Sequence, residues 1–220
     1  MKIGIESNLL RSLFKNVYFI NGTAYAGKST AVQNLAERFD GICCGENYHD
    51  SLTGLADPEH QPALCYFQTM SGWQEFVTRT PEAYDAWITG VSREAAEMES
   101  ALLLQLSAQD KKMFVDTNIP LECLHEIADP SHVAVMLSPQ HMSANRFFDR
   151  PDPEKQFLYQ QLLLCPDPEW ALANYRKCLE TINSPEHYRE YAESGFFTWV
   201  RTEESTLASA MAALEKHFHL

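Results

Sequence analysis

VYFINGTAYAGKST, residues 17–30, is the stretch that decides the fold of this chain. Its first four residues, Val17–Ile20, form a β-branched and aromatic run that predicts a buried strand. The residues Gly22–Ser29 fit the spacing G-x-x-x-x-G-K-[ST], and an amphipathic helical pattern follows from Lys28 to about Phe39. A strand, a glycine loop and a helix in this order are the context that the motif requires, so the stretch predicts a phosphate-binding loop.

This loop suits a polyphosphate for physical reasons. Glycines allow successive backbone N–H groups to point inward around an anion, and the following helix adds the positive end of its dipole. We expect Lys28 to reach the β- and γ-phosphates, Ser29 to ligate Mg²⁺ and Thr30 to hydrogen-bond the α-phosphate. The alternative is a glycine turn that feeds a helix and binds nothing. The expected nucleotide-binding residues are Gly22, Thr23, Ala24, Tyr25, Ala26, Gly27, Lys28, Ser29 and Thr30.

Four further short apolar runs predict strands at residues 41–45, 113–115, 133–137 and 196–200. Runs of this kind suit strands that are buried on both faces, and hence a parallel sheet covered by helices. Between them a capping residue followed by proline recurs, as at Asp57-Pro58 and Thr80-Pro81, which is typical of helix starts. We therefore expect mostly helix over residues 57–108 and 139–194, and a further helix over 8–15.

In the stretch Val17–Phe39 the sequence resembles the small-molecule kinases of the P-loop class, such as shikimate, gluconate and nucleoside-monophosphate kinases. Beyond that stretch the resemblance covers only the order of strands and helices. It implies a three-layer α/β fold around a five-stranded parallel sheet of order 2-3-1-4-5. It also implies a single domain, 1–220, whose parts are a core (16–45, 112–138, 195–220), a helical acceptor-binding insertion (46–108), and a lid and helical insertion (139–194).

The resemblance places an arginine-bearing lid near residues 143–156. Arg146 and Arg150 are four residues apart and therefore share one helical face. Arginine binds phosphate oxygens through two parallel hydrogen bonds and neutralises charge during transfer. We expect both arginines to be catalytic; the alternative is a surface ion pair, for example of Arg150 with Glu154.

Three acidic residues are candidates for the catalytic base. Asp116 ends the third expected strand, where ligands bind in open α/β sheets, and it could hold Mg²⁺ through water or accept a proton. Glu46 and Asp50 follow the second strand, where acidic residues of the resembling kinases bind or deprotonate the acceptor hydroxyl. The family's D-x-D spacing is absent here, so the base stays open among the three. Ser29 and Asp116 are the expected metal-binding residues, and helix capping is the alternative for Asp50 and Asp116.

The segment after the second strand bears on the acceptor. Residues 46–112 carry eleven acidic and four basic side chains, and only Arg79 and Arg93 are available to hold a phosphate. This balance favours a neutral hydroxyl-bearing acceptor, or one with a single anionic group. The aromatic residues of the segment could stack on a planar substrate, but their helical spacing favours core packing. Arg201, after the last strand, is expected beside the adenine, with a plain surface arginine as the alternative.

The net charge of −13 argues against a broad nucleic-acid-binding face, which needs a dense basic surface. No apolar run approaches the length of a membrane span. Six cysteines show no C-x-x-C spacing, so we expect buried free thiols in a reducing compartment and a cytoplasmic protein.

Together these observations predict a Mg²⁺-dependent kinase that transfers the γ-phosphoryl group of ATP to a small molecule, either a hydroxyl-bearing metabolite, a nucleoside or a nucleotide. The alternative is a nucleotide-dependent regulatory ATPase or switch that acts on a protein partner. The sequence shows no convincing N-K-x-D motif, which weakens a GTPase interpretation. A degenerate fold that binds nucleotide without transfer is disfavoured because Lys28 and Ser29 are intact.

Overall fold

The computed structural model describes residues 4–139 and 153–220. Its centre is a five-stranded sheet in the order β2-β3-β1-β4-β5, and every neighbouring pair of strands is parallel. The expected all-parallel sheet of order 2-3-1-4-5 is therefore confirmed. The strands are β1 (Val17–Gly22), β2 (Ile42–Cys44), β3 (Met113–Asp116), β4 (Val133–Leu137) and β5 (Phe197–Val200).

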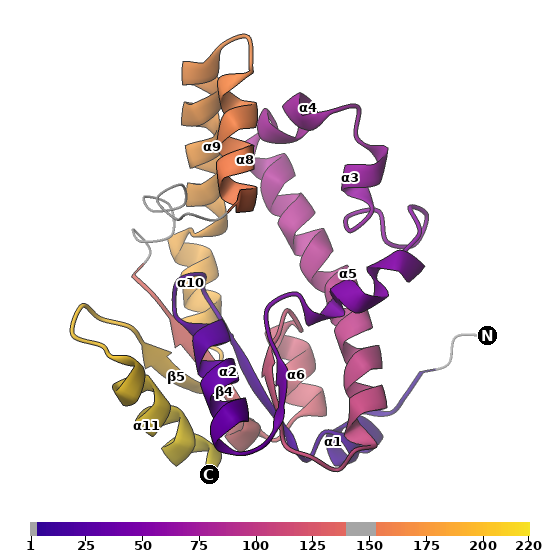
Figure 1. Ribbon diagram of the computed structural model, residues 1–220, viewed down its shortest axis with the longest axis vertical. Coiled ribbons are helices and arrows are strands. Elements are labelled where there is room, and N and C mark those ends of the chain that lie inside the picture. Colours follow the sequence, from indigo (N-terminus) through magenta and orange to yellow (C-terminus); the bar gives the residue numbers. More distant parts are fainter. Residues whose placement is uncertain (1–3, 140–152) are drawn as a thin grey trace.

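Helices cover both faces of this sheet (Figure 1). Because side chains alternate along a strand, Val17 and Phe19 of β1 face one side while Tyr18 and Ile20 face the other. The helices on the side of Phe19 are α1 (Ser7–Leu13), α5 (Pro81–Ser107), α6 (Leu121–Ile127) and α10 (Pro185–Ala192). The helices on the side of Ile20 are α2 (Lys28–Arg38) and α11 (Leu207–Phe218).

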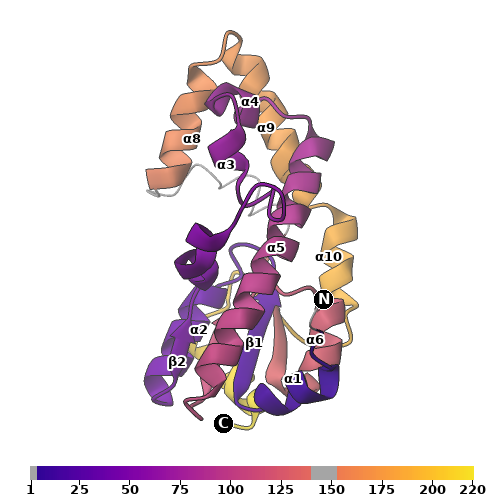
Figure 2. The ribbon, with the colours of Figure 1, turned by 90° about the vertical axis from the view of Figure 1, so that its right-hand side faces the viewer.

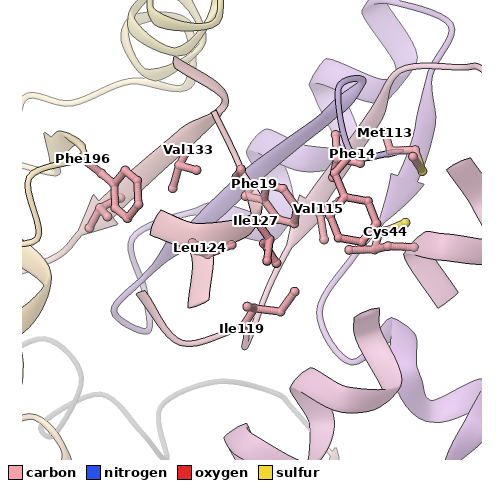
Figure 3. Close-up of a cluster of buried hydrophobic side chains, with 14 of the residues drawn as sticks. Phe14, Phe19, Cys44, Met113, Val115, Ile119, Leu124, Ile127, Val133 and Phe196 are labelled. Carbon is pink, nitrogen blue, oxygen red and sulfur yellow. The ribbon is translucent and has the colours of Figure 1, made fainter. Parts of the chain in front are cut away.

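The core on the side of Phe19 is drawn in Figure 3. Phe14, Phe19, Val115 and Leu124 are at most 2% exposed there. Complete burial of one such side chain stabilises a fold by about 1.5–3 kcal/mol. This packing fixes the sheet and, with it, the positions of the residues that follow the strand ends.

A second group of helices lies beyond the sheet and is seen from two sides in Figures 1 and 2. The long helix α5 runs from the sheet into this group, where Tyr84 packs against Phe76, Leu162 and Tyr175. The aromatic residues of this segment form a core cluster, as their helical spacing favours. The elements beyond the sheet are η1 (Tyr48–Leu55), α3 (Tyr66–Thr69), α4 (Trp73–Val77), α8 (Pro153–Leu163) and α9 (Pro168–Ile182), and a short η2 (Pro130–His132) precedes β4.

The pattern of a capping residue before proline predicts three helix starts correctly. The side chains of Thr80, Asp167 and Ser184 each accept a hydrogen bond from a backbone N–H in the first turn of α5, α9 and α10. The start expected at Asp57-Pro58 is wrong: Asp57 accepts backbone hydrogen bonds from residues 59 and 60, and only a turn forms. Pro62 explains this, because a proline at that position removes a backbone donor and stops a helix.

Candidate functional site

The loop 22–29 between β1 and α2 has a backbone that few residue types tolerate. Gly22 and Gly27 have φ angles of +127° and +95°, and Tyr25 also lies in the left-handed region at +66°. A Cβ atom on Gly22 would stand 2.0 Å from the carbonyl oxygen of Met136 in β4, so only glycine fits. The loop opens into the first turn of α2, whose N–H groups have no intrahelical acceptors and point towards the space above the loop.

Strand β4 and its following residue hold this loop in place. The N–H of Thr23 donates to the carbonyl of Met136 at 3.0 Å, and the N–H of Ser138 donates to the hydroxyl of Thr23 at 2.8 Å. The hydroxyl of Ser138 donates in turn to the carbonyl of Ala24 at 2.7 Å. Thr23 is among the expected nucleotide-binding residues, but its N–H is used within the protein in this structure.

Lys28, Ser29 and Asp116 meet at the ends of β1 and β3. Residue 116 is brought there by the strand register, in which Ile20 pairs with Asp116. The Ser29 hydroxyl donates to the Asp116 carboxylate at 2.8 Å, and the Lys28 Nζ lies 3.9 Å from the other carboxylate oxygen. The same Nζ donates to the carbonyl of Thr23 at 3.3 Å. The structure thus brings together the lysine, hydroxyl and carboxylate that the sequence singles out.

Burial dominates the electrostatics of Asp116. The carboxyl is only 4% exposed, and its desolvation raises its pKa above the usual aspartate value. Lys28 and the Ser29 hydrogen bond act in the opposite direction, while Glu46 and Glu99 add to the increase. Ionisation of this buried carboxyl therefore costs free energy, and a cation placed beside it would reduce that cost.

The Ser29 and Asp116 oxygens fit the requirements of Mg²⁺. This ion prefers hard oxygen ligands, and at nucleotide sites it is bound by one or two protein groups together with phosphate oxygens and water. Among residues 4–139 and 153–220, no group of three or more His, Cys, Asp or Glu side chains is placed to hold a metal ion.

A small cavity of about 140 Å³ lies beside the loop, on the side of β5 and α11. Thr30, Trp199 and Arg201 are among its lining residues. The Arg201 guanidinium donates to the carbonyl of Tyr25 at 2.7 Å and so supports the loop directly. Arg201 is therefore a residue that braces the loop and borders this cavity, and not a plain surface arginine.

A larger cavity of about 630 Å³ begins at the same loop and extends towards the helices beyond the sheet. Gly22, Lys28 and Asp116 border one end, and helices α5, α6 and α10 supply much of the remaining wall. Glu46 lines this cavity. Both side chains are exposed, but Asp50 lies outside the lining, and this separates the two candidates after β2.

Glu99 is a buried acidic residue whose role was not expected from the sequence. It is fully buried on α5, and its carboxylate accepts hydrogen bonds from the Thr117 hydroxyl at 2.7 Å and from the Asn118 backbone and side-chain amides at 3.0 and 2.8 Å. The Tyr48 hydroxyl donates to it at 3.5 Å, and burial followed by the charge of Glu99 raises the Tyr48 pKa. Glu99 therefore ties the segment after β2 to the residues after β3. The available signal was an acid in the i, i+4 stripe 95–99–103, whose other members are buried and apolar.

A second missed group is the pair formed by Asp85 and His187, which come from α5 and α10. Their side chains are 3.1 Å apart, and Glu190 lies 3.5 Å from the other ring nitrogen. All three residues line the large cavity. No local sequence pattern connects positions 102 residues apart, so only the fold reveals this cluster.

Arg79 and Arg93, the two arginines available after the second strand, lie in different surroundings. Arg79 stacks over the ring of Tyr66, with its guanidinium carbon 3.7 Å from the ring centroid, and belongs to the aromatic cluster. Arg93 lines the large cavity, so the two arginines do not form a phosphate-binding pair. The reason is that Arg79 lies next to α4, where aromatic rings surround it. Arg146 and Arg150 lie outside the described residues.

The expectation for the cysteines is partly wrong. Cys44, Cys65, Cys165 and Cys178 are buried free thiols, and burial raises the pKa of the Cys44 thiol to about 12. The other two, Cys43 and Cys123, are exposed. Within the part of the chain that the structure describes, no helix combines the length and apolar character needed to cross a bilayer.

Comparison of the chain with known protein families, curated proteins and solved structures found no match. The assignment of a function therefore depends on the geometry of the loop and of the two cavities beside it.

Proposed function

We propose that this chain is a Mg²⁺-dependent P-loop kinase that transfers the γ-phosphoryl group of ATP to a small-molecule acceptor. One observation carries the proposal: the large cavity is continuous with the glycine loop, because Gly22, Lys28 and Asp116 border it. A nucleotide held by the loop would present its last phosphate to a space of about 630 Å³, which is the size of ordinary small-molecule sites. This cavity favours a kinase over a switch protein that acts on a protein partner.

The residues divide into donor-binding and acceptor-binding groups. The N–H groups at the start of α2 would bind phosphate oxygens, and Lys28 would leave the Thr23 carbonyl to reach the β- and γ-phosphates. Ser29 and Asp116 would hold the metal ion. When bound, this ion would neutralise part of the negative charge on the phosphates. The small cavity beside Arg201 would receive the nucleoside part of the donor.

Glu46 is the base that the geometry supports best. It lines the cavity, whereas Asp116 bonds Ser29 and Asp50 lies outside the lining. In the reaction the bond between the γ-phosphorus and the bridging oxygen of ATP breaks, and a bond from that phosphorus to the acceptor oxygen forms. The proton of the acceptor hydroxyl passes to Glu46, and ADP leaves.

Calorimetry with Mg²⁺ and a non-hydrolysable ATP analogue tests the donor site, and ADP release with a panel of nucleosides, sugars and hydroxy acids tests transfer. We expect binding in the native chain, release stimulated by an acceptor, and a loss of at least about 10³-fold in turnover for Lys28→Ala. Lys177→Ala, an exposed lysine on α9, is the matched control and should behave as the native chain. Absence of nucleotide binding would refute the proposal, and slow release that ignores every acceptor but responds to a protein would favour the switch.

A further inference from the structure

The wall of the large cavity carries a charge pattern that bears on the identity of the acceptor. Setting aside Lys28 and Asp116 at the donor end, the lining residues within 4–139 and 153–220 include four carboxylates, one arginine and one histidine. The carboxylates are Glu46, Asp85, Glu122 and Glu190, and the basic side chains are Arg93 and His187. A cleft lined mostly by one sign of charge concentrates ligands of the opposite sign.

Bound donor would make an anionic acceptor still less favourable. MgATP carries a net negative charge, and it would stand at the end of the cavity bordered by Gly22 and Lys28. An acceptor with a phosphate or carboxylate would meet this charge and the acidic wall together, with Arg93 as the one described arginine that lines the cavity. The wall therefore favours an acceptor that is positively charged.

The cavity is also long. Asp85 and Arg93 lie eight positions apart on α5, which corresponds to about 12 Å along the helix axis. Glu99, which bonds Asn118 at the end of β3, is six positions further, so Asp85 stands about 20 Å from the strand ends. An acceptor that reaches both ends must be longer than a single sugar ring.

At the far end, Asp85, His187 and Glu190 form a group that could recognise an amine. His187 contacts both carboxylates, at 3.1 and 3.5 Å, and holds α5 and α10 together at this point. The Asp85 side chain is 31% exposed and that of Glu190 is 66% exposed, so both keep oxygens accessible from the cavity that they line. Accessible carboxylate oxygens on two facing helices are suitable partners for an ammonium group.

We propose that the acceptor is an elongated hydroxyl compound with one or more amino groups, which bind near Asp85 and Glu190 while the reacting hydroxyl lies near Glu46. This inference deepens the proposed function and rests on it for the phosphoryl transfer, but the binding of a cationic ligand can be measured separately. Amino sugars of two rings have the required length, hydroxyl groups and charge.

Three disaccharides of similar shape test the charge. They are a glucosamine disaccharide with two amino groups, cellobiose, which is neutral, and cellobionate, which is anionic. In calorimetry with the ATP analogue bound, we expect the amino disaccharide to bind at least tenfold more tightly than cellobiose, and cellobionate to bind least. The difference should shrink as the salt concentration rises.

Substitutions that remove single charges test where the amino group of the ligand binds. Asp85→Asn and Glu190→Gln should each weaken the amino disaccharide by about two- to fivefold and leave cellobiose unchanged. Arg93→Gln should tighten it by a similar factor, because a like charge is removed. Glu186→Gln is the matched control on α10: it pairs with Arg189 on the exposed surface and should change nothing.

Two outcomes would overturn the inference: cellobionate binding as tightly as the amino disaccharide, or no saturable binding of any of the three. If either result is found while the ATP analogue binds normally, the amine acceptor is refuted and the proposed nucleotide site is not affected. Loss of analogue binding, with the charge order of the disaccharides preserved in the free protein, would instead refute the kinase and keep the cation-binding cavity.

Discussion

The loop end of the sheet and the helices beyond it are held by different kinds of contact. At the loop, the constraints are in the backbone: positive φ angles at Gly22 and Gly27, and a strand carbonyl that leaves no room for a Cβ atom. Beyond the sheet, side chains from α4, α5, α8 and α9 supply the stability through aromatic and apolar packing. The loop is therefore specified by a short local sequence, while the helical part depends on residues far apart in the chain.

The comparison predicts that the largest effect comes from the backbone of the loop. Gly22→Ala places a Cβ atom against the Met136 carbonyl and forces a φ of +127° on an alanine. We expect a loss of at least about 3 kcal/mol in the free energy of unfolding, together with loss of nucleotide binding. Urea denaturation and calorimetry measure the two effects.

Gly54→Ala is the matched control for this substitution. Gly54 lies in η1, with nothing within 4 Å of an added Cβ atom, and it does not have a positive φ. It should change stability by less than about 1 kcal/mol. If the two substitutions lowered the free energy of unfolding equally, the backbone at Gly22 would be no more constrained than that at Gly54.

The next largest effect is expected at Glu99, which joins the two regions. Glu99→Ala leaves the Thr117 hydroxyl and both amides of Asn118 without their acceptor, so we expect a loss of about 2 kcal/mol. Glu97→Ala, on an exposed position of the same helix, should be close to neutral. Thermal and urea denaturation compare the two, and an equally stable Glu99→Ala protein would show that the network does not contribute.

The sheet and the loop could be predicted because their signals are local. The run Val17–Ile20 and the spacing Gly22–Ser29 lie within one short stretch, and the other strands form where the apolar runs predict them. Their order in the sheet was implied by the resemblance and not by the runs themselves. Asp116 was found because the end of a parallel strand is a ligand-binding position in such sheets.

The acceptor side could not be predicted in the same way. Asp85 and His187 are brought together only by the packing of α5 against the helices that follow β4. From the sequence, Arg79 is expected to be available to hold a phosphate, but the aromatic rings of Tyr66, Phe76 and Trp87 surround it. Contacts between distant segments decide these roles, and they leave no periodic pattern in the chain.

A moderate effect is expected inside the aromatic cluster. The hydroxyls of Tyr84 and Tyr175 lie 3.3 Å apart in a buried site. Tyr84→Phe or Tyr175→Phe should each cost about 1 kcal/mol, because each removes the hydrogen bond between the two hydroxyls. The double substitution should cost less than the sum of the two single effects. Urea denaturation of all three proteins gives the coupling, while nucleotide affinity should stay at its native value; additive losses would argue against a shared hydrogen bond.

The smallest effect is a pH dependence at Asp116. Its folded-state pKa is raised by burial, so its contribution to stability is present below the ordinary aspartate pKa, about 3.8, and is lost as the pH rises through the raised value. Asp116→Asn should therefore make the protein without nucleotide slightly more stable at neutral pH and should flatten this part of the profile. The Tm of both proteins, measured from pH 4 to about 8, checks this, and parallel profiles would contradict it.

The helix α5 connects three parts of the molecule. Its 27 residues carry Tyr84 into the aromatic cluster, Arg93 along the cavity and Glu99 to the end of β3. Because one helix makes all of these contacts, the packing of the aromatic cluster and the position of Glu99 beside β3 are not set independently. Gly90, the tenth residue of α5, has a low helix propensity, and a Cβ atom there would meet the Cβ of Ala63 at 3.0 Å. A side chain at position 90 would therefore require the segment around Ala63 to shift away from the helix.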